Sequence, residues 1–109
     1  MAAINSFPFF KKESEAKISD VYRSHANTDA TIEVKGSATA FNLEVQACID
    51  IEEEENWITL GVIDENSYEI LNVVAKAGIY TFNAMGKNVR VKINSISGGD
   101  ITVVGKFLY

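Results

Sequence analysis

Apolar and polar residues alternate along much of the chain with a period of two, which is typical of strands that bury one face. The clearest run is AFNLEVQACID, residues 40–50. Its inward face is predicted to carry the residues Phe41, Leu43, Val45, Ala47 and Ile49. Cys48 falls on the polar face of the same run. This run therefore predicts a half-buried strand.

A second alternating run, NVRVKINSI, lies near the C-terminus at residues 88–96. Its alternation predicts an outward face with Arg90 and Lys92, and an inward face with Val89, Val91, Ile93 and Ser95. In the shorter run TIEVK, Ile32 and Val34 are expected to point inward.

Further strands are predicted at WITLGVI, SYEILNVV, GIYTFNA and DITVVGKFL, with polar or glycine-containing turns between them. Gly98-Gly99 predicts a hairpin, because glycine adopts a positive φ at little cost. About eight short strands joined by tight turns are typical of an all-β fold. We expect an antiparallel β-sandwich, of the jelly-roll or immunoglobulin-like kind.

The N-terminal segment does not follow this pattern. No helical spacing is convincing in KKESEAKISDVYRSH, and its second half, ISDVYR, is expected to be extended. We therefore divide the chain into an extended arm, residues 1–17, and a sandwich domain, residues 18–109. In the arm, Phe7, Phe9 and Phe10 are costly to leave in water. They either close the core of their own chain or dock as an assembly arm on another subunit.

Charge is unevenly distributed in this chain of 109 residues with a net charge of −5. Residues 36–75 carry nine acidic and no basic side chains, whereas residues 76–109 carry five basic side chains and one acidic. One interpretation is that acidic and basic strands are neighbours in one sheet and pair across it. The other is that an acidic face of one subunit meets a basic face of the next, with Arg90 and Lys92 at the interface.

Several kinds of chemistry find no support in the sequence. The negative charge argues against nonspecific nucleic-acid binding, and no apolar run approaches the ~18 residues that span a bilayer. One histidine, one cysteine and no phosphate-binding motif argue against an enzyme or a bound cofactor. A single cysteine is typical of folding in a reducing cytoplasm. The glutamates at 52–55 lack the spacing of a calcium loop, which favours a solvated loop over a cation site.

Trp57 is the only tryptophan. An exposed aromatic ring on a sandwich can stack against a sugar, which makes Trp57 a candidate glycan contact. The alternative is that the ring belongs to the core, where a lone tryptophan of a small sandwich usually lies.

The order of these motifs resembles that of small β-sandwich domains in the structural proteins of tailed bacteriophages and prophages. The resemblance runs through TIEVKGSATAFNLEVQACID (31–50), WITLGVID (57–64) and GIYTFNAMGKNVRVKINSISGGDITVVG (78–105). The chain departs from the pattern in its acidic loop after Asp50 and in the short connection at residues 85–88.

The resemblance implies a non-enzymatic virion protein, used in capsid decoration or as a head or tail accessory. Its expected partners are other virion proteins and further copies of itself, and its expected location is the virion after synthesis in the host bacterial cytoplasm. The alternative is a carbohydrate-binding module that attaches to a host glycan. The family pattern is a fold pattern and transfers no catalytic or metal-binding residue.

Overall fold

The computed structural model describes residues 6–24, 29–49 and 56–108. It contains eleven strands: β1 (Phe7–Glu13), β2 (Lys17–Ile18), β3 (Tyr22–Arg23), β4 (Asp29–Gly36), β5 (Ala40–Cys48), β6 (Ile58–Thr59), β7 (Val62–Asp64), β8 (Ile70–Leu71), β9 (Gly78–Asn83), β10 (Asn88–Ser97) and β11 (Ile101–Leu108). All pairings between them are antiparallel.

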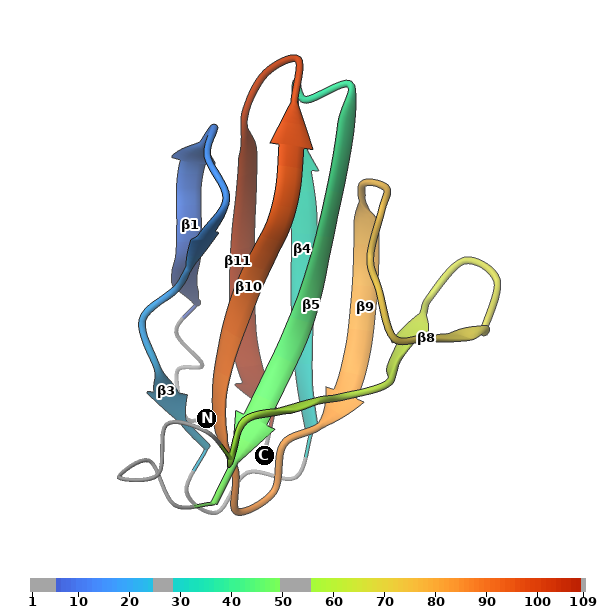
Figure 1. Ribbon diagram of the computed structural model, residues 1–109. Helices are drawn as coiled ribbons and strands as arrows, with labels where there is room; N and C mark the ends of the chain where they lie inside the picture. The colour runs from blue at the N-terminus through green and yellow to red at the C-terminus, as the bar shows by residue number, and fades with distance from the viewer. Residues whose placement is uncertain (1–5, 25–28, 50–55, 109) are drawn as a thin grey trace.

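The strands form two sheets that pack face to face (Figure 1). The six-stranded sheet has the order β1-β11-β4-β9-β7-β8, and the five-stranded sheet has β2-β10-β5-β6, with β3 also paired to β10. The predicted antiparallel β-sandwich is therefore confirmed. The expected count of about eight strands was low because several elements are only two residues long.

The core lies between the sheets and is built from the inward residues of both. The long strands β10 and β5 contribute Val89, Val91, Ile93, Leu43 and Val45, as the alternation predicted. The six-stranded sheet contributes the residues Ile32, Val34, Tyr80, Phe82, Ile101 and Val103. Burial of a side chain of this size contributes roughly 1.5–3 kcal/mol, which makes this cluster the main source of stability.

Two expected inward positions are wrong. Ser95 is exposed because a bulge at Asn94 shifts the register of β10, so that Ile93 pairs with Leu43 but Ser95 pairs with Asn42. The alternation changes sides there, and Ile96 packs against the core instead. Ile49 is 85% exposed because β5 ends one residue before it. Cys48, expected on the polar face, is buried, and strand alternation gives no account of this.

The predicted hairpin at Gly98-Gly99 is also wrong, since the two strands that it joins lie in different sheets. β10 pairs with β5 in the five-stranded sheet, whereas β11 pairs with β1 and β4 in the other. The glycines have φ values of 76° and 144°, which allows the chain to arch tightly from one sheet to the next. The two glycines do form a turn with positive φ values, as predicted. The residues of a turn do not determine to which sheet the next strand belongs.

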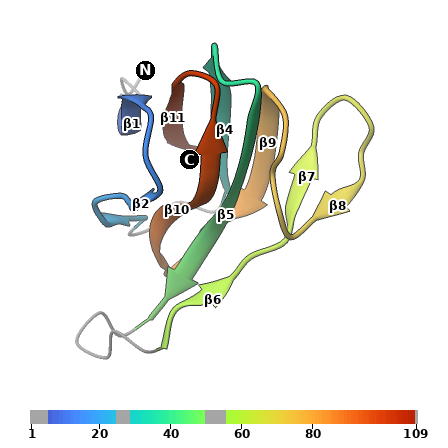
Figure 2. The same cartoon turned by 45° about the horizontal axis from the view of Figure 1, so that its top comes forward.

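The run WITLGVI was expected to form one strand and is divided between the sheets. Ile58–Thr59 pairs with β5, and after Leu60-Gly61 the chain crosses so that Val62–Asp64 pairs with β9. The run SYEILNVV contributes the short strand Ile70–Leu71, which pairs with β7, and an isolated antiparallel bridge between Val74 and Leu43 of β5. As a result, β7 and β8 form a hairpin that projects from one edge of the sandwich (Figures 1 and 2).

The N-terminal segment, expected to be an arm, belongs to the sandwich. β1 pairs with β11 along the edge of the six-stranded sheet, and β2 and β3 pair with β10 across the other sheet. The extended conformation predicted for ISDVYR is present in β2 and β3. The described part of residues 1–17 therefore contributes one strand and the start of the crossing between the two sheets.

Replacing Phe10 by alanine should destabilise the fold strongly, because its ring is 4% exposed within the core. The free energy of unfolding in urea should fall by about 3–5 kcal/mol, the usual cost of a large aromatic cavity. The adjacent Lys11→Ala, at an exposed position, should change it by less than about 0.5 kcal/mol. Equal stability of the two variants would show that β1 is not part of the folded unit.

Candidate functional site

The three phenylalanines of the N-terminal segment lie against their own chain. Phe9 and Phe10 are buried, and Phe7 is half-buried, with its ring stacked on Tyr22 at a centroid distance of 4.3 Å. The Tyr22 hydroxyl donates a hydrogen bond of 2.8 Å to the carbonyl oxygen of Pro8, which ties β1 to β3. Of the two alternatives for these rings, the structure places them where they close their own core.

The predicted interface residues, Arg90 and Lys92, project from the outer face of the five-stranded sheet. Two contacts hold the guanidinium of Arg90 in place. Its Nε donates a 2.7 Å hydrogen bond to Oε1 of Gln46, and its Cζ lies 4.1 Å from the ring centroid of Trp57. A cation over an indole ring is attracted by the negative face of the ring, with an energy of about 0.5–1 kcal/mol at an exposed site. Arg90 is thus partly committed to contacts within its own chain.

Trp57 is half-buried just before β6, and the guanidinium of Arg90 occupies one face of its ring. Trp57 therefore lies outside the core between the sheets, and its ring is not open on both faces. Only the face away from Arg90 could stack against a sugar.

A hydrogen-bond network centred on Glu44 lies beside this pair. Oε1 of Glu44 accepts bonds of 2.7 Å from both Nε2 of Gln46 and Oγ1 of Thr59. Oε2 accepts a 3.1 Å bond from Nδ2 of Asn94, whose position depends on the bulge in β10. The carboxylate therefore joins β5, β6 and β10, and through Gln46 it is connected to Arg90.

This network changes the acidity of Glu44. Partial burial on its own would raise the pKa of the carboxyl. The hydrogen bonds from Thr59, Gln46 and Asn94, together with the charge of Lys92, outweigh burial and hold the pKa below its ordinary value of 4.5. The sheet therefore favours the charged form of Glu44.

Lys92 lies between two strands that bring it different neighbours. It is directly opposite Glu44 on β5 and Ile18 on β2. One acidic residue of the block 36–75 thus lies opposite one basic residue in the same sheet, which meets the first interpretation of the charge blocks only at this pair. No ion pair within 4.0 Å involves Lys92 among the described residues. The charge of Glu44 attracts Lys92 but does not hold its ammonium in an ion pair. The hypothesis that Lys92 lies at a subunit interface therefore stays a prediction.

The loop at 52–55, considered as a cation site, lies outside the described residues. Within residues 6–24, 29–49 and 56–108, no group of three or more histidine, cysteine, aspartate or glutamate side chains could hold a metal ion. In the same part of the chain, no helix has the length and apolar character needed to cross a membrane.

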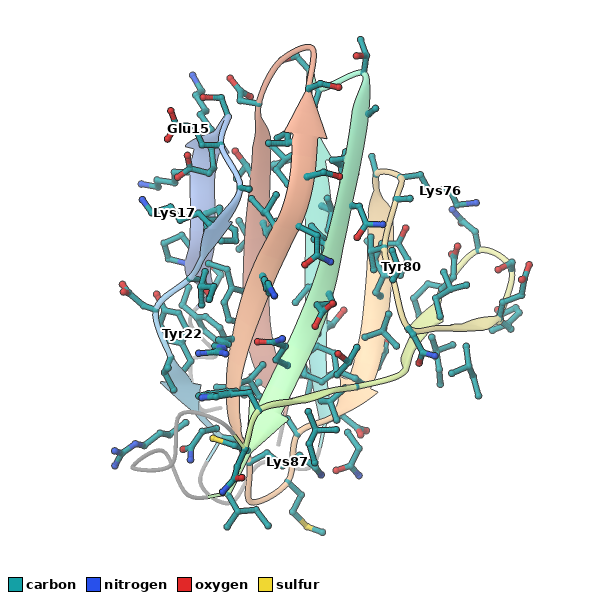
Figure 3. The ribbon with its side chains drawn as sticks, in the orientation of Figure 1. Glu15, Lys17, Tyr22, Lys76, Tyr80 and Lys87 are labelled. Atoms are coloured by element: carbon teal, nitrogen blue, oxygen red, sulfur yellow. The ribbon has the colours of Figure 1, made fainter. Side chains whose placement is uncertain are left out.

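The β7–β8 hairpin is a feature that the sequence did not single out. Asp64 at its base is 2% exposed; its Oδ1 accepts a 2.9 Å hydrogen bond from the backbone N–H of Asn66, and its Oδ2 lies 3.7 Å from Nζ of Lys76. Nearby, Tyr80 is fully buried, and its hydroxyl donates a 2.7 Å bond to the carbonyl oxygen of Lys76 (Figure 3). Burial, with the negative charge of Asp64, raises the pKa of Tyr80. These contacts anchor the hairpin to β9.

Two prophage proteins of known structure share the β-sandwich fold of this chain. The SPBc2 prophage-derived protein YomS shares it with a TM-score of 0.85 and 20% identity, over 96% of this chain and 92% of that chain. The PBSX exported protein XepA shares it with a TM-score of 0.87 and 17% identity, over 96% of this chain. No family model and no curated protein matches the sequence.

The resemblance to phage and prophage sandwich domains is therefore confirmed at the level of the fold. At these identities the likeness does not transfer residue roles. The chain spans 37% of XepA, where the fold is one part of a longer protein.

Replacing Glu44 by glutamine should weaken the fold in a pH-dependent way. A carboxyl whose pKa is depressed on folding stabilises the protein above its unfolded-state pKa, and this contribution is lost as the pH falls through the folded-state value. The difference in unfolding free energy between the wild type and Glu44→Gln should therefore be full at pH 7 and shrink below about pH 4.5.

The matched control is Glu33→Gln on β4, whose carboxylate is exposed and pairs with Lys35 at 3.4 Å. Exposed pairs of this kind contribute about 0–1 kcal/mol, so the control should change stability little at any pH. Urea unfolding at several pH values provides the measurement. A Glu44→Gln difference that stays constant with pH would contradict the proposed role of the network.

Proposed function

We propose that this chain is a non-enzymatic structural protein of a phage or prophage particle, used in capsid decoration or as a head or tail accessory. The observation that carries the proposal is the similarity of its whole sandwich to two prophage proteins, at TM-scores of 0.85 and 0.87 over 96% of the chain. A sandwich fold can serve many purposes, so the specific role rests on the surfaces of this chain.

Two properties of those surfaces support a structural role. The outer face of the five-stranded sheet holds its polar side chains in a network between β5, β6 and β10, which gives a fixed surface rather than a mobile one. The edge hairpin β7–β8 exposes large apolar side chains, Ile63 at 39% and Ile70 at 74%. Exposed apolar groups on a fixed scaffold are typical of surfaces that bind other proteins.

The carbohydrate-binding alternative rests on Trp57. Because Arg90 covers one face of the indole, a sugar would have only the other face, and a strong stacking platform is not favoured. A glycan array that shows binding by the wild type and none by Trp57→Ala would support this alternative over the structural role.

The proposal is tested by following the protein during particle production. The phage or prophage that encodes the chain is induced, and particles are separated from free protein on a density gradient. We expect the chain to co-sediment with assembled particles and to appear in their mass spectra at a fixed ratio to the major capsid or tail protein. Recovery of the chain only in the soluble fraction, or outside the cells without particles, would overturn the proposal.

A further inference from the structure

The tip of the β7–β8 hairpin presents an unusual tyrosine. Tyr68 is 77% exposed and has a φ of 60°, a left-handed conformation that is rare for a bulky residue. Its backbone N–H donates a 2.7 Å hydrogen bond to the carbonyl oxygen of Asp64, which closes the turn. A strained conformation persists where the surrounding structure enforces it, and such positions concentrate at functional sites.

Apolar side chains continue from the tip along the outer face of the hairpin. Ile63 and Ile70 are directly opposite each other in the register of β7 and β8, so they share one face. Glu65 and Glu69 lie on either side of the tip, and Glu65 accepts a 3.0 Å hydrogen bond from Thr81. The hairpin is thus an apolar knob with Glu65 and Glu69 beside its tip, and its base is held by Asp64, whose carboxylate pairs with Lys76.

A second surface with exposed apolar and basic side chains lies across the molecule, on β2, β3 and β10. An open depression of about 510 Å³ is lined by Ala16, Lys17, Ile18, Lys92, Ile93 and Asn94. Ile18 is 47% exposed at this site, and Val21 nearby is 40% exposed. Lys92 and Arg23 extend the basic character along the same face, and neither forms an ion pair within 4.0 Å to a described residue. Lys17 pairs with Glu13 at 3.4 Å.

The two surfaces share exposed apolar side chains and carry some charges of opposite sign. Each has exposed apolar side chains at its centre, and the acidic side chains around the hairpin are opposite in sign to Lys92 and Arg23. A rigid exposed tyrosine is well suited to fill a depression, since tyrosine loses little conformational entropy and is enriched among the residues that dominate binding energies.

We propose that the β7–β8 hairpin of one copy of this chain docks into the depression between β2 and β10 of a second copy. Tyr68 enters the depression, Ile70 packs near Ile18, and Glu65 and Glu69 face Lys92 and Arg23. This proposal rests on the structural role proposed above and supplies its partner and contact surface.

The geometry also fixes the kind of symmetry. β8 and β2 lie at opposite sides of the sandwich (Figure 2), so one copy cannot use both surfaces against the same partner. The contact is therefore head to tail. Contacts of this kind close into a ring or continue as a filament, and both are suited to a repeating particle.

The experiment mixes two full-length variants, each defective at one surface. Tyr68→Asn removes the ring from the hairpin, and asparagine tolerates a positive φ. Lys92→Glu reverses the charge at the depression. Both positions are on the surface, and melting followed by circular dichroism should show that both variants remain folded. Met85→Asn, at an apolar position 57% exposed and away from the hairpin, and Lys106→Glu, on β11, are the matched controls.

Light scattering after size exclusion gives the masses. The wild type and both controls should form an oligomer that weakens as salt is raised, and each variant alone should run as the 12.0 kDa monomer. An equal mixture of Tyr68→Asn and Lys92→Glu should form a dimer and nothing larger, because only one intact hairpin and one intact depression remain per pair. A monomeric wild type, assembly that survives Tyr68→Asn, or a mixture without dimer would each overturn the proposal.

These outcomes are separate from those of the particle experiment. A chain found in particles but monomeric alone and bound there through a different protein would overturn the self-association and leave the structural role standing. A chain that assembles head to tail but is absent from particles would overturn the structural role and leave the self-association standing.

Discussion

The whole molecule depends on apolar packing between two sheets that each have only one face to bury. The inward side chains of β10, Val89, Val91 and Ile93, belong to the same buried cluster as those of β4, β9 and β11 on the facing sheet. Because successive residues of a strand point to opposite faces, fixing these inward positions also fixes which residues point outward. The placement of Arg90 and Lys92 on the surface is thus a consequence of the core, and no separate interaction is needed to explain it.

The same constraint explains one charge contact of the chain. Antiparallel pairing of β5 with β10 sets Glu44 opposite Lys92, and Glu44 is hydrogen-bonded into the sheet. The remaining acidic residues of the hairpin and the remaining basic residues of β3 and β10 lie on different sides of the sandwich. Both signs also lie side by side in places, as in the pairs of Lys17 with Glu13 and of Lys76 with Asp64.

Some of this could be predicted from the sequence, and the limits have physical reasons. Alternation identified Leu43, Val45, Val89 and Val91 as core residues, because period two is a local property of each strand. Alternation failed at Ser95, where an extra residue in β10 reversed it. The turn chemistry of Gly98-Gly99 predicted a hairpin, but the turn leads into the other sheet. Bulges and sheet membership depend on distant partners, and a single sequence does not reveal them.

The candidate surfaces show the same division. Arg90 and Lys92 were identified as outward basic residues, but the contacts of Arg90 with Gln46 and Trp57 required the register of three strands. Neither the positive φ of Tyr68 nor the projection of the hairpin leaves a signal in the residue order. The polar turn predicted between WITLGVI and SYEILNVV was the only local sign.

The proposed role and the proposed contact are tested together most directly by an electron cryomicroscopy map of phage or prophage particles from cells that produce this chain. The account predicts a repeating layer of sandwiches in which each β7–β8 hairpin lies over β2 and β10 of the next copy; a map in which the chain is absent, or in which its copies do not touch through these surfaces, would contradict it.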